Sequence, residues 1–122
     1  MSKRVLVVDD SATVRQMVGT TLGQAGYEIV EAVDGADGLS KLSDDHDISM
    51  VICDINMPRM SGLEMMEQIA QSKTIRKVPV VMLTTEGQPA LIQRARQAGA
   101  KGWIVKPFKP DLLLAAVNKL TA

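Results

Sequence analysis

The sequence predicts an α/β domain, in which helices cover both faces of a parallel β-sheet. Short apolar runs of strand length alternate along the chain with stretches whose apolar residues recur at helical spacing. This strand–helix pair occurs five times, and such alternation is typical of a parallel sheet. Residues 4–8, 50–53 and 79–83 are almost entirely apolar, as expected of strands buried on both faces. We expect residues 1–122 to form a single domain.

The first strand is predicted at Arg4–Val8, and the helix after it is expected to begin near Ser11 or Thr13. Gly26 is expected to end that helix. Glu28–Ala32 alternates between polar and apolar residues, which is typical of a strand near the edge of a sheet.

The second helix is predicted to begin at Asp34, which is a good N-cap residue. Gly35 and Gly38 weaken this helix by their low helix propensity. Residues 43–47 are polar and acidic, and are expected to form the connection to the next strand.

The third strand covers residues 50–53 and ends in Asp54. Residues 59–62 are expected to form a turn. Ser61 and Glu64 have the spacing of a capping box, which predicts the start of the third helix.

The last two pairs have strands at residues 79–83 and 101–105 and helices at 89–98 and 110–120. Both helices begin with proline, which favours the first turn of a helix. Three residues of the last helix are expected to face the core: Leu113, Val117 and Leu120.

Composition excludes several classes of protein. Basic and acidic residues number 14 each, which argues against binding to nucleic acid or membrane surfaces through bulk charge. The apolar runs are all far shorter than the roughly 20 residues of a membrane span. Cys53 is the single cysteine, so we expect a small core residue, no internal disulfide and a reducing, cytoplasmic setting. The N-terminal residues do not resemble a signal peptide.

Polar side chains follow four of the five predicted strands. They are Asp9 and Asp10 after the first, Asp54 after the third, Thr84 after the fourth and Lys106 after the fifth. Ligands of open parallel sheets bind at the carboxyl ends of the strands, so we expect these groups to lie together at one edge.

Such a set of groups is suited to phosphoryl transfer. Neighbouring carboxylates repel one another, and a divalent cation such as Mg²⁺, which prefers oxygen ligands, relieves that repulsion. Asp54 would then remain ionised and could act as the nucleophile, because aspartate carboxylates form acyl phosphates. Lys106 and Thr84 could neutralise and bind the transferred oxygens.

These motifs resemble the receiver domain of the two-component response-regulator family. The resemblance covers essentially the whole chain, and the residues that carry it are Asp9, Asp10, Asp54, Ile55, Asn56, Met57, Pro58, Gly62, Thr84, Lys106, Pro107 and Phe108. It implies a flavodoxin-like, doubly wound sheet of five parallel strands in the order 2-1-3-4-5, with five helices.

The resemblance also implies the roles of individual residues. Asp54 would be the phosphoacceptor for a histidine kinase. Mg²⁺ would be held by Asp10, Asp54 and the backbone carbonyl of Asn56, with Asp9 assisting through water. Thr84 and Lys106 would bind the phosphoryl oxygens, and the peptide bond before Pro107 would be cis.

Loss of the acyl phosphate in this family occurs by in-line attack of water. Asn56 and Glu86 are expected to flank that path and to set the rate of dephosphorylation. A phosphatase is a further expected partner. The protein would therefore be a switch that catalyses its own phosphorylation and dephosphorylation, and not an enzyme in the ordinary sense.

Within the family, the sequence is most similar to single-domain chemotaxis regulators of the CheY type. We expect no output domain after Ala122, and therefore expect output by binding a motor or signalling protein. The expected binding surface combines residues 89–98, 101–105 and 110–120, with Thr84 and Trp103 as switch residues. Leu112 and Leu114 lie about 100° to either side of Leu113, so at least one should border that surface. The family usually has Tyr or Phe at the position of Trp103, whose larger indole needs more space to rotate fully inward.

Four other functions are alternatives to this one. A phosphate sink or phosphorelay intermediate in another pathway remains the main alternative. A flavin-binding module is disfavoured because acids stand where a phosphate would bind. An aspartyl-phosphate phosphatase would need an acid where Asn56 stands. An adaptor without phosphorylation would not need the intact set of acids. The protein is expected to act as a monomer.

Overall fold

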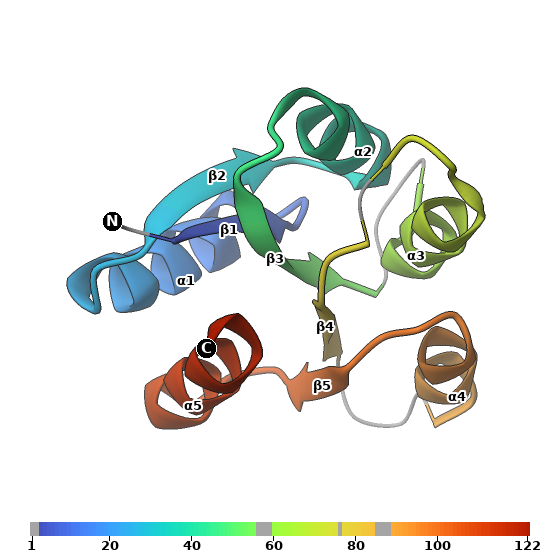
Figure 1. The fold of residues 1–122 in the computed structure, drawn as a ribbon. Coiled ribbons are helices and arrows are strands. Elements are labelled where there is room, and N and C mark those ends of the chain that lie inside the picture. Colours follow the sequence, from blue (N-terminus) through green and yellow to red (C-terminus); the bar gives the residue numbers. More distant parts are fainter. Residues whose placement is uncertain (1–2, 56–59, 76, 85–88) are drawn as a thin grey trace.

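The computed structural model describes residues 3–55, 60–75, 77–84 and 89–122. It contains one parallel sheet of five strands in the order β2-β1-β3-β4-β5 (Figure 1). The sequence pattern predicts the parallel sheet, and the family resemblance implies this strand order. The strands are β1 (Arg4–Val8), β2 (Glu28–Ala32), β3 (Ile48–Asp54), β4 (Val80–Thr84) and β5 (Gly102–Val105). The helices are α1 (Ala12–Gln24), α2 (Gly35–Asp44), α3 (Gly62–Gln71), α4 (Pro89–Gln97) and α5 (Pro110–Thr121).

Helices pack on both faces of the sheet and create two hydrophobic cores. Helices α1 and α5 cover one face, and α2, α3 and α4 cover the other (Figure 1). Leu113 and Val117 of α5 are fully buried in the first core together with Val5 and Val7 of β1. Leu6 and Val8 point to the second core instead, because successive residues of a strand face opposite sides. The apolar runs of the central strands therefore supply both cores.

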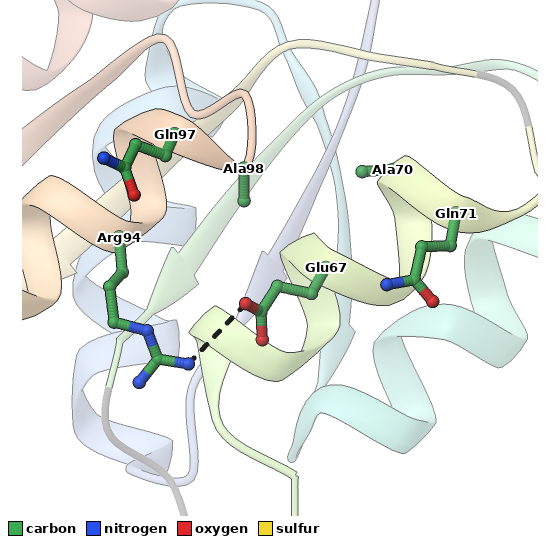
Figure 2. Close-up of a pocket in the computed structure, with 6 residues that line it drawn as sticks. All are labelled: Glu67, Ala70, Gln71, Arg94, Gln97 and Ala98. Carbon is green, nitrogen blue, oxygen red and sulfur yellow. Dashed lines mark ion pairs between the residues drawn. The ribbon is translucent and has the colours of Figure 1, made fainter.

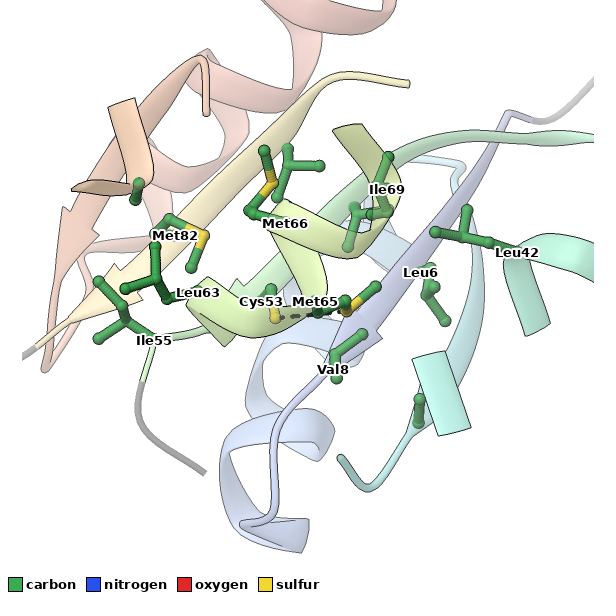
Figure 3. Close-up of a cluster of buried hydrophobic side chains, with 14 of the residues drawn as sticks. Leu6, Val8, Leu42, Cys53, Ile55, Leu63, Met65, Met66, Ile69 and Met82 are labelled. Carbon is green, nitrogen blue, oxygen red and sulfur yellow. Dashed lines mark hydrogen bonds between the residues drawn. The ribbon is translucent and has the colours of Figure 1, made fainter. Parts of the chain in front are cut away.

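Cys53 is fully buried in the second core, as predicted for a small core residue. Its Sγ lies 3.8 Å from Sδ of Met65 (Figure 3). Burial raises the pKa of the Cys53 thiol, and the negative charges of Asp54 and Asp9 raise it further. The thiol is therefore an unreactive packing group.

Several predicted element boundaries differ from the structure by one or two residues. Strand β3 begins at Ile48, because Ile48 is already buried against the core. Helix α2 extends to Asp44, so residues 43 and 44 are helical and not part of the connection. Gly62 was predicted in a turn but is the first helical residue of α3.

The predicted helix starts are confirmed by the contacts of their caps. Ser11, Asp34 and Ser61 are the N-caps of α1, α2 and α3, and each accepts a hydrogen bond from a backbone N–H three residues on. Ser61 and Glu64 form both hydrogen bonds of the capping box. The polar residues before these helices thus fix where each helix begins.

Gly38 has a packing role that its helix propensity does not indicate. A Cβ atom at Gly38 would lie 3.0 Å from a side-chain carbon of Val8 and 2.9 Å from the end of Met65. The glycine thus allows α2 to pack closely on β1 and α3, at some cost in intrinsic helix stability.

Each helix of the described residues is too short or too polar to cross a membrane.

Candidate functional site

The carboxyl ends of the strands bring the predicted acidic residues together. One carboxylate oxygen from each of Asp9, Asp10 and Asp54 lies within 4.8 Å of the others. Lys106 reaches the same cluster from the end of β5, with Nζ 3.0 Å from Oδ2 of Asp9 and 3.3 Å from Oδ2 of Asp54. Four residues from three strand ends therefore form one site.

Asp9 is fully buried, and both of its carboxylate oxygens have partners. The backbone N–H of Ser11 donates to Oδ1 at 2.9 Å, while Lys106 donates to Oδ2. Arg15 donates from Nη1 to the backbone carbonyl of Asp9 at 2.6 Å. Ser11 is the N-cap of α1 and Arg15 lies in its first turn, so the start of that helix holds Asp9 from one side while Lys106 holds it from the end of β5. Sequence reasoning missed this role of Ser11 and Arg15.

Asp54 is the last residue of β3 and is only 8% exposed. Ile55 continues the strand direction by donating its N–H to the carbonyl of Leu83 at 2.9 Å, and then accepts from the N–H of Gly62 at 3.2 Å. A Cβ atom at Gly62 would lie 2.1 Å from the backbone oxygen of Asp54. Glycine at position 62 is therefore what allows α3 to begin directly against the residue that carries the buried carboxylate.

Lys106 remains positively charged in this site. Burial is the largest single effect on its pKa and lowers it, but the hydrogen bond from Lys106 to Asp9 and the charges of Asp54 and Asp9 together outweigh burial. The net result is a pKa of Lys106 above its usual value. The backbone N–H of Lys106 donates to the carbonyl of Thr84 at 2.7 Å, which ties the ends of β5 and β4 together.

Two of the other predicted site residues are described by the structure, and two lie outside the described residues. Thr84 is buried at the end of β4, and the peptide bond between Lys106 and Pro107 is cis, as the family resemblance implies. Trp103 lies on β5 with 41% of its surface exposed. Asn56 and Glu86 fall outside the described residues, so their expected roles in metal binding and dephosphorylation remain predictions.

The acidic cluster fits a magnesium ion. Oxygen ligands of Mg²⁺ lie about 2.1 Å from the metal, so two ligands of one ion are at most roughly 4.2 Å apart. The carboxylate oxygens here are already close to that spacing. Asp10 is exposed, which leaves room for the water ligands that Mg²⁺ retains. Asp9, Asp10 and Asp54 are thus the side chains that could hold the metal.

A separate shallow pocket of about 250 Å³ lies between α3 and α4 (Figure 2). An ion pair between Arg94 and Glu67, with Nη2 and Oε2 3.6 Å apart, spans it. The pocket contains none of the acidic-cluster residues and is not part of the site.

Comparison with known proteins agrees with the geometry of the site. The family model of the response regulator receiver domain matches residues 5–118. Chemotaxis protein CheY1 of Helicobacter pylori is 40% identical over 111 residues, which is 90% of each chain. Chemotaxis protein CheY of Bacillus subtilis is 39% identical over 120 residues, which is 98% of each chain. The solved structure of chemotaxis response regulator CheY4 of Vibrio cholerae superposes with a TM-score of 0.89 and 40% identity, covering 98% of this chain and 99% of that one.

Proposed function

The chain belongs to the family of response regulator receiver domains, and on that premise we propose that it is a phosphoacceptor switch of chemotaxis signalling. Asp54 accepts a phosphoryl group from a histidine kinase in the presence of Mg²⁺. Phosphorylation then changes the surface formed by α4, β5 and α5, called here the α4–β5–α5 face, so that it binds a motor or signalling protein. The names of the related chemotaxis proteins support the assignment of the pathway.

The observation that carries this proposal is the position of Lys106 between two carboxylates. Its ammonium group lies within 3.3 Å of both Asp9 and Asp54, inside an acidic cluster whose donors suit Mg²⁺. A phosphoryl group arriving at Asp54 brings further negative charge to this place. A fixed cation beside the nucleophile offsets that charge without reorganisation, which is how most phosphoryl-transfer sites act.

The proposed chemistry uses the residues of this chain as follows. An oxygen of Asp54 attacks the phosphorus of phosphohistidine, the new O–P bond forms, and the P–N bond breaks with its electron pair remaining on the imidazole. Lys106 and the hydroxyl of Thr84 bind the transferred oxygens. Bound Mg²⁺ supplies additional charge neutralisation. Water later attacks the phosphorus, which restores the Asp54 carboxylate and releases phosphate, with Asn56 and Glu86 setting the rate.

This cycle is that of a signalling switch and not of an enzyme with a separate substrate. The proposal includes a cytoplasmic location, which the single unpaired Cys53 favours. A phosphatase would be an additional partner. A phosphate sink or a phosphorelay intermediate is the alternative, because either could use the same site without a protein target on the α4–β5–α5 face.

Phosphorylation by a small donor tests the proposal directly. Incubation with acetyl phosphate and Mg²⁺ should add one phosphoryl group, detected as an increase in intact mass. The increase should disappear with a chelator or in Asp54→Asn. Labelling that persists in Asp54→Asn, or that does not depend on the cation, would refute the assignment of Asp54 and its metal.

A further inference from the structure

Two arginines of α4 point to opposite sides of the helix. Arg94 and Arg96 stand on either side of the buried Ala95 in the sequence. Each helical residue turns the chain by about 100°, so the two arginines lie about 200° apart around the helix axis. Arg94 reaches Glu67 of α3, at 3.6 Å between Nη2 and Oε2. Arg96 reaches β5 instead, where its guanidinium carbon lies 4.5 Å from the centroid of the Trp103 ring.

Trp103 occupies an unusually open position for so large an apolar side chain. Trp103 is paired in register with Met82 of β4, and paired residues of neighbouring parallel strands face the same side of the sheet. The side chain of Met82 belongs to the core under α2, α3 and α4. The Trp103 side chain therefore projects from that same face. Strand β5 is at the edge of the sheet, and α4 leaves Trp103 and Val105 41% and 40% exposed. The indole also borders a hollow of about 430 Å³ that Leu112 of α5 lines from the other side.

Among the described residues, the stacking on Trp103 is the contact made by the Arg96 guanidinium. A guanidinium over an indole is the most favourable common cation–π pair. We propose that Arg96 is a positioning residue that holds the Trp103 indole in its outward place on the α4–β5–α5 face. The contact itself does not depend on the proposed function. Its role does, because the position of the indole matters only if a target binds to this face.

This arrangement gives a reason for tryptophan at position 103, where the family usually has Tyr or Phe. Indole attracts a cation more strongly than a phenyl or phenol ring. The side chain that is largest and hardest to rotate inward is thus matched by a cation on the neighbouring helix. Because Arg96 is part of α4, any displacement of α4 relative to β5 is transmitted to the exposed surface of the indole.

Trp103 is the single tryptophan of the chain, so its fluorescence reports the position of this one indole. Removing Arg96 should shift the ratio of held to released indole by about two- to fivefold, as expected for an exposed cation–π pair. Time-resolved anisotropy of Arg96→Ala and Arg96→Gln should show a larger fast component than wild type. Arg96→Lys should recover part of the difference, because it retains the charge but not the planar group.

Arg94→Ala is the matched control, because Arg94 lies on the same helix two residues away and contacts α3 instead of the indole. It should leave the anisotropy and the acrylamide quenching of Trp103 at wild-type values. Equal anisotropy in wild type and Arg96→Gln, or equal effects of Arg94→Ala and Arg96→Ala, would overturn the proposal. Circular dichroism of each variant identifies any loss of folding, and the Lys and Gln variants keep the test valid if Arg96→Ala is poorly folded.

The same variants separate this inference from the proposed function. Acetyl phosphate with Mg²⁺ should label Arg96→Ala and Arg94→Ala at Asp54 to the wild-type extent, since neither arginine belongs to the acidic cluster. Wild-type protein that cannot be labelled would refute the proposed function and leave the anisotropy result intact. Labelled wild type with an indole insensitive to Arg96 would refute the inference alone.

Discussion

Lys106 is one cation shared by two buried or nearly buried carboxylates, and this makes its contribution to stability dependent on pH. Its pKa is raised in the folded protein, so the stabilisation is fully present below the ordinary pKa of lysine, about 10.4. It is lost as the pH rises through the higher pKa of the folded state. The unfolded chain releases the proton first, which is why stability falls on the alkaline side.

Lys106→Met should lower the free energy of unfolding by about 2 kcal/mol at neutral pH without divalent cations, within the range of hydrogen bonds to charged groups. The difference from wild type should shrink above pH 10.4. Urea unfolding at a series of pH values measures both effects. Lys119→Met, at an exposed position of α5, is the control and should change neither; a pH-independent difference would contradict the role given to Lys106.

Adding one methyl group at Gly62 should displace the backbone that carries Asp54. Gly62→Ala would place a carbon 2.1 Å from the backbone oxygen of Asp54, so either α3 or the end of β3 must move. We expect a loss of about 3 kcal/mol in unfolding free energy, at the upper end for overpacking, together with reduced labelling of Asp54.

Gly23→Ala provides the matched control for this prediction. Gly23 also lies in a helix, but nothing is within 4 Å of its added Cβ atom. Alanine there should stabilise the protein by about 0.5–1 kcal/mol through helix propensity. Chemical denaturation of the two variants compares them, and equal effects would mean that the contact with Asp54 is not what limits position 62.

At the scale of an element, the end of α3 depends on a residue beyond the helix. The ammonium of Lys77 donates to the backbone carbonyls of Ile69, Ala70 and Ser72, which are among the last of the helix and its cap. Carbonyls at a helix C-terminus have no partners within the helix, and a cation there is also favoured by the helix dipole.

Lys77→Met should therefore destabilise the last turn of α3 by about 1 kcal/mol, the usual effect of losing a capping contact. Hydrogen exchange of the amides in residues 68–72 should accelerate by roughly fivefold, since 1.4 kcal/mol corresponds to tenfold. Lys73→Met, at another exposed position of the same connection, should leave those rates unchanged, because the cap contacts come from Lys77. Faster exchange spread evenly over all helices would indicate global destabilisation instead.

At the scale of the whole molecule, the acidic cluster lowers the stability of the metal-free protein but provides the ligands for Mg²⁺. Asp10→Asn removes one of three close negative charges and should stabilise the metal-free protein by about 1 kcal/mol, comparable to two charges 4 Å apart in water. The same change removes a ligand, so it should abolish most of the stabilisation by Mg²⁺, which for wild type reaches about 2.7 kcal/mol at 100 times the dissociation constant.

Thermal unfolding with and without Mg²⁺ checks both halves of this prediction. Asp47→Asn, which removes an exposed acid in the connection before β3, should change neither value appreciably. A metal response in Asp10→Asn equal to that of wild type would exclude Asp10 as a ligand.

Much of the fold could be predicted from the sequence because the strands are buried on both faces. The run from Val5 to Val8 has few structures open to it other than a central strand, and Ser61 with Glu64 marks a helix start by local chemistry alone. Helix ends were less predictable: residue 44 is helical although the acidic sequence around it resembles a loop. Helix ends depend on tertiary contacts that local propensity does not contain.

The sequence predicts which residues form the site, but not the contacts that orient them, because those contacts also depend on tertiary packing. The rule for parallel sheets predicts that Asp9, Asp54 and Lys106 meet at one edge. It does not predict that Ser11 orients Asp9, that Gly62 must lack a side chain beside Asp54, or that Arg96 stacks on Trp103. These contacts depend on where helices pack against strands, which is a property of the assembled molecule.

The order of the strands also has a consequence for how the chain assembles during synthesis. Strand β1 lies between β2 and β3, so the sheet cannot enclose its first strand until residue 54 has been made. After that point β4 and β5 are added one at a time to the same growing edge. The proposed docking surface on β5 is therefore completed last, on a nucleus that already contains Asp9, Asp10 and Asp54. A nascent chain would therefore assemble its acidic cluster first, and would gain Lys106 only together with the strand that carries the docking surface.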